Sequence, residues 1–145
     1  MEIKKAKLKD VSSISKLNRK FFHEKERDWK GLISSKKSEM FILEFDKAIV
    51  GFTGIKYCSW NNTAHVIDIF VHPDYRNRGY GTNLVKFLLK YLKNKKYRTL
   101  IAEAPSLNPV LKLYLKNGFR VCGFNDHYYF NKGKEIAIFL SYDFK

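Results

Sequence analysis

The sequence predicts a mixed α/β protein, an α+β arrangement in which one mixed sheet carries helices on its faces. Short apolar segments joined by tight turns fill residues 39–71, which is typical of antiparallel hairpins. Residues 83–104 then follow the pattern of a helix and a strand, which favours a crossover connection and a mixed sheet. With 145 residues, of which 45% are apolar, the chain is long enough for a single domain over residues 1–145.

The N-terminal half is expected to place a strand and two helices before the hairpins. Residues 3–8 alternate weakly and predict the first strand, and Asp10 is placed to cap a helix. Apolar residues at helical spacing extend that helix to about Phe22, and a second short helix is expected over residues 29–35. Strands are then predicted over residues 39–45, 48–59 and 63–71, with turns at Asp46-Lys47 and Asn61-Asn62.

The C-terminal half is predicted to alternate helices and strands. A leucine-rich stripe indicates a helix over residues 83–94, and a strand is expected over residues 99–104. Pro109 suits the first turn of a helix that ends near Lys116, with Gly118 as its left-handed cap. The last two strands are expected over residues 119–124 and 135–144, on either side of an aromatic and polar loop. The predicted order is β-α-α-β-β-β-α-β-α-β-β.

Residues 71–82 (VHPDYRNRGYGT) join the strand over residues 63–71 to the helix over residues 83–94. The first turn of a helix has backbone N–H groups without partners, and its dipole attracts anions. Gly79 and Gly81 let a ligand approach the backbone closely, while Arg76 and Arg78 add positive charge. We interpret this loop as a pyrophosphate cradle, with an ordinary surface turn as the alternative. It is not a P-loop, because no Gly-Lys-Ser/Thr follows, and Leu84 replaces the third glycine of a Rossmann fingerprint.

Two motifs resemble those of the GNAT superfamily of N-acetyltransferases. Arg76, Gly79 and Gly81 fill the defined positions of its R/Q-x-x-G-x-G/A signature, and residues 113–119 (LYLKNGF) resemble its L-Y-x-K-x-G-F segment. The resemblance extends along essentially the whole chain and implies the GNAT fold. In that fold the strands over residues 63–71 and 99–104 splay apart around the thioester arm. The resemblance thus implies acetyl-CoA as co-substrate, no metal, and direct attack by an amine in a ternary complex.

The resemblance also implies roles for individual residues. Tyr114 is expected to be the general acid, because a phenol with a pKa near ~10 is protonated at neutral pH and can donate to the departing sulfur. The alternative is a helix tyrosine that only packs against the sheet. In the family, a backbone N–H at the end of the strand before the cradle stabilises the oxyanion. The expected cofactor-binding residues are Ile69, Phe70, Val71, Arg76, Asn77, Arg78, Gly79, Tyr80, Gly81, Thr82 and Asn108.

One of these residues departs from the family pattern. The family carries an asparagine that contacts the pantetheine arm, and Leu107 stands at that position here. Asn108 stands one position later, so the role is carried over to it. Either the turn is shifted by one residue in this chain, or Ser106 or Asn108 substitutes for the family's asparagine.

Asp68 is the candidate for the proton acceptor, because it interrupts an otherwise apolar strand shortly before the cradle. Simple alternation places Val66, Asp68 and Phe70 on one face of this strand. The same rule places His65, Ile67, Ile69 and Val71 on the other face. The alternative for Asp68 is an ionised carboxylate paired with a nearby arginine, lysine or histidine. His65 and His72 are weaker candidates for the base.

Two segments are expected to line the acceptor site, the bend over residues 23–29 and the loop over residues 125–129. Both mix acids with aromatic side chains, which suits a cationic amine. The candidate substrate-binding residues are Glu24, Trp29, Asp126 and Tyr128. The C-terminal segment resembles that of streptothricin-acetyltransferase-like members, which favours a small-molecule amine. The alternative is a peptide amine, either a protein N-terminus or a lysine.

The formal net charge of +14 raises the question of whether the protein binds nucleic acid. The lysines are spread along the chain, which favours a solvated basic surface. A nucleic-acid-binding module with a non-catalytic GNAT fold is the alternative of another class. The sequence shows no apolar run of about 18 residues, no signal peptide and only two widely spaced cysteines, so we expect a cytoplasmic protein without membrane contact. A homodimer is left open.

Overall fold

The computed structural model describes residues 1–22, 26–129 and 134–145. One sheet of seven strands runs through it in the order β1-β2-β3-β4-β5-β7-β6. The strands are β1 Glu2–Lys5, β2 Ser38–Phe45, β3 Ala48–Cys58, β4 Thr63–Val71, β5 Thr99–Pro105, β6 Arg120–Asn125 and β7 Ala137–Asp143. The α-helices are α1 Val11–Leu17, α2 Trp29–Ser34, α3 Tyr80–Asn94 and α4 Val110–Lys116. Shorter helical turns are η1 Leu8–Asp10, η2 Asn18–Phe22 and η3 Pro73–Tyr75.

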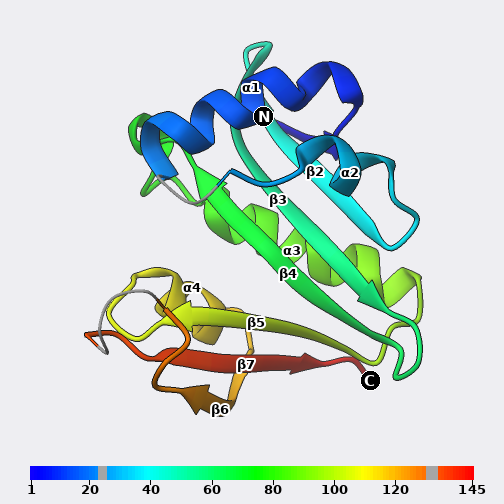
Figure 1. Cartoon of the computed structure of the whole chain (residues 1–145), viewed down its shortest axis with the longest axis vertical. Helices are drawn as coiled ribbons and strands as arrows, with labels where there is room; N and C mark the ends of the chain where they lie inside the picture. The colour runs from blue at the N-terminus through cyan, green and yellow to red at the C-terminus, as the bar shows by residue number, and fades with distance from the viewer. Residues whose placement is uncertain (23–25, 130–133) are drawn as a thin grey trace.

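The helices cover the sheet from both sides, with α1 and α2 on one face and α3 on the other (Figure 1). On the first face, Ile14 of α1 and Trp29 of α2 pack with Phe52 and Phe70. On the second face, the apolar stripe of α3 packs against β2–β5 and α4. This stripe consists of Leu84, Val85, Leu88 and Leu92, all buried. The amphipathic pattern of this helix therefore fixes which face it turns to the sheet.

The predicted order of elements is confirmed, and most predicted bounds agree within two residues. The turn Asp46-Lys47 has φ of 50° and 66° at its two residues, as a tight hairpin turn requires. Gly118 has φ of 90°, and it follows α4 as a left-handed cap. The helix that was expected to end at Phe22 does reach it, but its last turn, η2, is a π-helix.

Two predicted bounds are wrong. The first strand ends at Lys5 and not at residue 8, because the backbone N–H of Lys7 turns to the carboxylate of Asp10 at 2.8 Å. Asp10 therefore stabilises η1 and makes no side-chain bond to the amides of α1. Helix α3 begins at Tyr80, three residues before the predicted start, because Gly79 adopts the left-handed conformation with φ of 85°.

Strand β4 also departs from simple alternation. Thr53 pairs with Ile69 and Ile55 pairs with Val66, so Gly54 alone lies opposite two residues of β4. This β-bulge shifts the alternation by one residue. Val66 consequently packs on the α3 face, Phe70 packs on the α1–α2 face, and Ile69 returns to the α3 face. The prediction that Val66 and Phe70 share one face is therefore wrong.

Strands β4 and β5 separate over most of their length, as expected from the resemblance. They pair in parallel only at Thr63–Thr99, Ala64–Leu100 and His65–Ile101. Figure 1 shows the two strands side by side at one end and diverging toward the other. No helix within residues 1–22, 26–129 and 134–145 has the length and apolar character that a membrane crossing requires.

Candidate active site

The cradle predicted from sequence is a strand–loop–helix unit. Strand β4 ends at Val71, the single turn η3 follows, and Gly79 caps α3. The first hydrogen bond from the helix back to its cap runs from the N–H of Asn83 to the carbonyl of Gly79, at 3.0 Å. The amides of the first helical turn before Asn83 therefore have no partner within the helix. They lie at the N-terminus of α3, which is the positive end of the helix dipole. An added Cβ at Gly79 would meet nothing within 4 Å, so the space beside the cap is open.

The arginines of the cradle have different surroundings. The Nε of Arg76 donates to the carbonyl of Val71 at 2.8 Å, and its guanidinium carbon lies 5.7 Å from the ring centroid of Phe70. Arg76 therefore ties the loop to the end of β4. Arg78 lies over the ring of Tyr75 at 5.6 Å and is exposed. Its charge faces solvent beside the helix start.

The gap between β4 and β5 leads from this cradle into the molecule. Ile69, Phe70 and Val71 pair with β3 on one side. From Val66 onward, the other edge of β4 pairs with no strand in the part of the chain that the structure describes. Backbone groups on this edge of β4 are thus placed to bind an extended ligand that enters the gap.

Tyr114 of α4 is buried, with 3% of its surface exposed, and its ring packs against Phe119 at 5.0 Å. Among the described residues, no group forms a hydrogen bond with its hydroxyl. Burial raises the pKa of this phenol, and the negative charges of Glu103 and Asp68 raise it further. The hydroxyl therefore carries its proton at neutral pH. A buried hydroxyl without a partner costs roughly 1–3 kcal/mol, which calls for a ligand atom beside it.

Glu103 of β5 is a carboxylate that sequence reasoning missed. Its Oε2 bonds Nε2 of His65, and its Oε1 accepts a hydrogen bond from the Tyr128 hydroxyl at 3.0 Å. Burial alone would raise the pKa of Glu103. The hydrogen bond and charge of His65, with the bond from Tyr128, outweigh this effect and hold the pKa below its usual value. A signal was present, since Glu103 interrupts an apolar strand as Asp68 does.

Asp68 lies in the bulge of β4, where only 6% of its side chain is exposed. The Nε and one terminal nitrogen of Arg27 donate to its two carboxylate oxygens, at 2.6 and 3.0 Å. Its backbone carbonyl accepts from the Thr53 hydroxyl at 2.7 Å. The alternative for Asp68 was an ion pair with a nearby basic residue, and Arg27 forms that pair. The role of Asp68 as a base stays a prediction.

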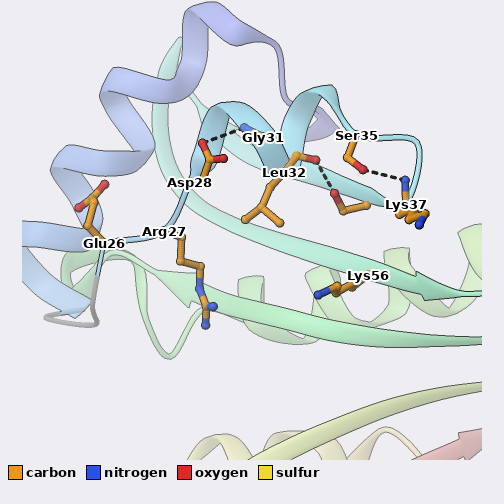
Figure 2. A pocket seen from close by; sticks show the side chains of 9 residues that line it. Glu26, Arg27, Asp28, Gly31, Leu32, Ser35, Lys37 and Lys56 are labelled. Atoms are coloured by element: carbon orange, nitrogen blue, oxygen red, sulfur yellow. Dashed lines mark hydrogen bonds between the residues drawn. The ribbon is translucent and has the colours of Figure 1, made fainter.

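Two pockets lie on the α1–α2 face of the sheet, and both are lined by Arg27, the partner of Asp68. The larger, about 580 Å³, lies beneath α2 (Figure 2) and is lined by Glu26, Arg27, Asp28, Gly31, Leu32, Ser35, Lys37, Ser38 and Lys56. The smaller, about 200 Å³, lies where β4 and β5 begin to separate and is lined by Arg27, Lys56, His65, Val66, Ile67, Glu103 and Tyr128. The described residues contain no group of three or more His, Cys, Asp or Glu side chains that could hold a metal ion.

The predicted acceptor residues are not brought together. Tyr128 lines the smaller pocket. Trp29 is buried in the core against Phe52, and its Nε1 donates to Glu26 at 2.6 Å, so its ring lies away from the mouth. Asp126 is exposed, bonds His127 at 3.0 Å and lines neither pocket. Glu24 lies outside the described residues.

Asn108, the candidate for the pantetheine arm, is exposed at the start of α4. Its Oδ1 accepts a hydrogen bond from the N–H of Val110 at 2.9 Å, which caps the helix. Its amide nitrogen remains the group available for a ligand. The role predicted for Asn108 stays a prediction.

The geometry agrees with comparisons to known proteins. Residues 8–119 match the model of the acetyltransferase (GNAT) family. The streptothricin acetyltransferase of Streptomyces lavendulae is 28% identical over 99 residues, which are 66% of this chain and 52% of that protein. An N-alpha-acetyltransferase of Sulfurisphaera tokodaii is 28% identical over 142 residues, covering 88% of this chain and 84% of that protein. The chain therefore spans about half the length of the first relative and most of the second.

A solved structure gives a further likeness. The provisionally named streptothricin acetyltransferase of Bacillus anthracis, crystallised with acetyl coenzyme A, superposes with a TM-score of 0.74 at 28% identity. The match covers 83% of this chain and 70% of that one.

Proposed function

The chain belongs to the acetyltransferase (GNAT) family, and from that premise we propose that it transfers the acetyl group of acetyl-CoA to a primary amine. The buried hydroxyl of Tyr114, which has no hydrogen-bond partner among the residues that the structure describes, is the observation that carries this proposal. The hydroxyl lies on α4, and the negative charges of Glu103 and Asp68 help to raise its pKa. An ordinary packing tyrosine would leave its hydroxyl in water or bonded to the protein.

The residues present fit coenzyme A. The free amides before Asn83 and the charge of Arg78 suit its diphosphate. The unpaired edge of β4 suits its extended pantetheine arm. When bound, acetyl-CoA supplies an acetyl group activated as a thioester. Backbone N–H groups at Ile69 to Val71 are proposed to stabilise the oxyanion, which is worth several kcal/mol in comparable sites.

Tyr114 is proposed to protonate the departing thiolate from its hydroxyl oxygen. Its raised pKa keeps the proton in place until a stronger base develops beside it. Burial also excludes water from this position. Both properties follow from the packing of α4 against the sheet.

Two carboxylates are candidates to accept the proton of the attacking amine. Asp68 was predicted from sequence, but both its oxygens bond Arg27. Glu103 faces the smaller pocket and shares a hydrogen bond with His65, through which a proton can move to solvent. We therefore assign the proton-accepting role to Glu103 with His65. Asp68 is proposed to hold Arg27 and add negative charge that attracts a cationic amine.

The acceptor is proposed to be a small-molecule amine or a peptide N-terminus. Likeness to the streptothricin acetyltransferases supports the first. Likeness to the N-alpha-acetyltransferase supports the second, and so does the open form of the larger pocket, which can admit a chain.

The test is acetyl-CoA-dependent thiol release with a panel of small amines, aminoglycoside-type antibiotics and peptides. Release that requires both substrates supports the proposal. No release with any acceptor, together with no calorimetric binding of acetyl-CoA at about 1 mM, would contradict it. Binding of nucleic acid without turnover would favour the non-catalytic alternative.

A further inference from the structure

The two pockets share the side chains of Arg27 and Lys56, and together we name them the acceptor trough. Its inner end reaches Glu103 and His65 at the gap. Its outer end runs beneath α2 to Lys37, just before β2 (Figure 2). An acceptor whose amine reaches the inner end must therefore place its remaining groups along the outer end.

The acids of the trough are already bonded to protein groups. Glu26 accepts from the Ser15 hydroxyl and from the Trp29 ring nitrogen, both at 2.6 Å. Asp28 accepts from the N–H of Gly31 at 3.0 Å and caps α2. At the inner end, Glu103 bonds His65 and Tyr128. These bonds fix the positions of the carboxylates and occupy part of their hydrogen-bonding capacity.

The lysines of the trough, unlike its acids, form no ion pair or hydrogen bond through their side chains with other described residues. Lys37 and Lys56 are exposed, and neither lies within ion-pair distance of a carboxylate in the described part of the chain. Lys56 is the register partner of His65 across β3 and β4, so its side chain starts beside the inner end. The ammonium groups of these two lysines are therefore not engaged in a direct ion pair within the described residues.

We infer that the acceptor is an amine whose neighbouring groups are negatively charged, such as the N-terminus of an acidic peptide or a free acidic amino acid. The inference rests on the proposed function. The amine would lie at Glu103 and His65, and the anionic groups would lie at Lys56 and Lys37. The same lysines would repel a polycationic acceptor, so both attraction and repulsion contribute to selectivity. The net charge of +14 would add to the attraction at low salt.

The experiment compares two matched peptides, Ala-Asp-Glu-Gly-Ser-Phe and Ala-Lys-Lys-Gly-Ser-Phe, with free aspartate and spermidine as small acceptors. We expect kcat/KM for the acidic peptide to exceed that for the basic peptide by about tenfold or more. The ratio should fall toward one in about 0.5 M NaCl. If free aspartate is acetylated with the same kcat/KM as the acidic peptide, the acceptor is a small molecule. A higher kcat/KM for the acidic peptide would identify a peptide N-terminus as the acceptor.

Charge-reversed variants test the residues. Lys56→Glu and Lys37→Glu should each lower the acidic-to-basic ratio, by about tenfold for Lys56→Glu. Lys90→Glu makes the same change in net charge on the outer surface of α3, on the other face of the sheet, and should leave the ratio unchanged. An unchanged ratio in Lys56→Glu would overturn the inference.

Calorimetry separates failure of the inference from failure of the proposed function. Acetyl-CoA and each peptide, the latter with coenzyme A present, are titrated into the intact protein. Two results would contradict the inference alone, each in a protein that binds acetyl-CoA. The first is a preference for the basic peptide, and the second is neither binding nor acetylation of the acidic peptide. A protein that does not bind acetyl-CoA contradicts the proposed function.

Discussion

Arg27 binds Asp68 through two hydrogen bonds, at 2.6 and 3.0 Å, and so joins the segment before α2 to the bulge of β4. The contact connects residues 41 positions apart in the chain. The two acidic residues of the site therefore differ in their partners. Glu103 bonds a histidine, which can release a proton, and Asp68 bonds a guanidinium, which cannot.

Glu103→Gln should lower kcat by about 100-fold or more, since it removes the proposed proton acceptor. Asp68→Asn should lower kcat by less than about tenfold, because it only weakens the contact with Arg27. Steady-state kinetics with a saturating acceptor measures both. A larger loss of kcat in Asp68→Asn than in Glu103→Gln would indicate that Asp68 is the base.

Tyr114→Phe should raise the free energy of unfolding of the cofactor-free protein by about 1 kcal/mol, because it removes a buried hydroxyl that has no partner in the described part of the chain. Urea denaturation measures the change. Tyr57→Phe is the matched control, since the Tyr57 hydroxyl donates to Glu39 at 2.7 Å, and its loss should lower stability by about 1 kcal/mol. Equal losses in both variants would mean that the Tyr114 hydroxyl has a partner.

Glu39→Gln should destabilise the fold by about 2 kcal/mol at neutral pH, because the buried carboxylate accepts from Tyr57 and Tyr91 at 2.7 and 2.6 Å. Burial would raise the pKa of Glu39, but these bonds and the charges of Lys95 and Lys5 outweigh it and lower the pKa. The stability from this carboxylate is therefore present above its unfolded pKa and is lost as pH falls through the lower folded value.

Urea denaturation from pH 7 to about pH 3 measures this dependence, and the difference between wild type and Glu39→Gln should shrink below about pH 4.5. Glu44→Gln is the control, because within the described ranges the one ion pair of Glu44 is a partly exposed contact with Lys4 at 3.2 Å. It should change stability by less than about 1 kcal/mol at every pH. A pH-independent difference for Glu39→Gln would contradict the assignment.

Gly79→Ala should raise the dissociation constant of acetyl-CoA by about tenfold, because alanine at φ of 85° is strained and shifts the start of α3. Calorimetry measures the affinity. Gly123→Ala is the control, since its added Cβ would come no closer than 3.7 Å to Phe139 and its φ is not positive. Unchanged affinity in Gly79→Ala would mean that the diphosphate binds elsewhere.

Local patterns were sufficient for most of the fold. The leucine stripe of α3, the turn at Asp46-Lys47 and the cap at Gly118 each depend on residues close together in sequence, and each was predicted. The strand–loop–helix unit of the proposed cradle was predicted for the same reason, since its parts are adjacent in the chain. Gly79 also explains why the predicted start of α3 was wrong. Its left-handed conformation caps the helix at residue 79, so that α3 begins at Tyr80.

Contacts between distant segments account for the rest. The bulge opposite Gly54 has no signal in β4 itself, so alternation assigned Phe70 and Val66 to one face. Glu103 reaches His65 and Tyr128, which are 38 and 25 positions away. Trp29 was expected at the acceptor mouth, but the core packing against Phe52 decided its position. Pairings of this kind require the sheet order to be known first.

The most direct test of the account is turnover by Tyr114→Phe at saturating acetyl-CoA and acceptor, with acetyl-CoA affinity measured in parallel. We predict that kcat falls by about 100-fold while the dissociation constant of acetyl-CoA changes less than about twofold. A variant that turns over as fast as the wild type would contradict the account.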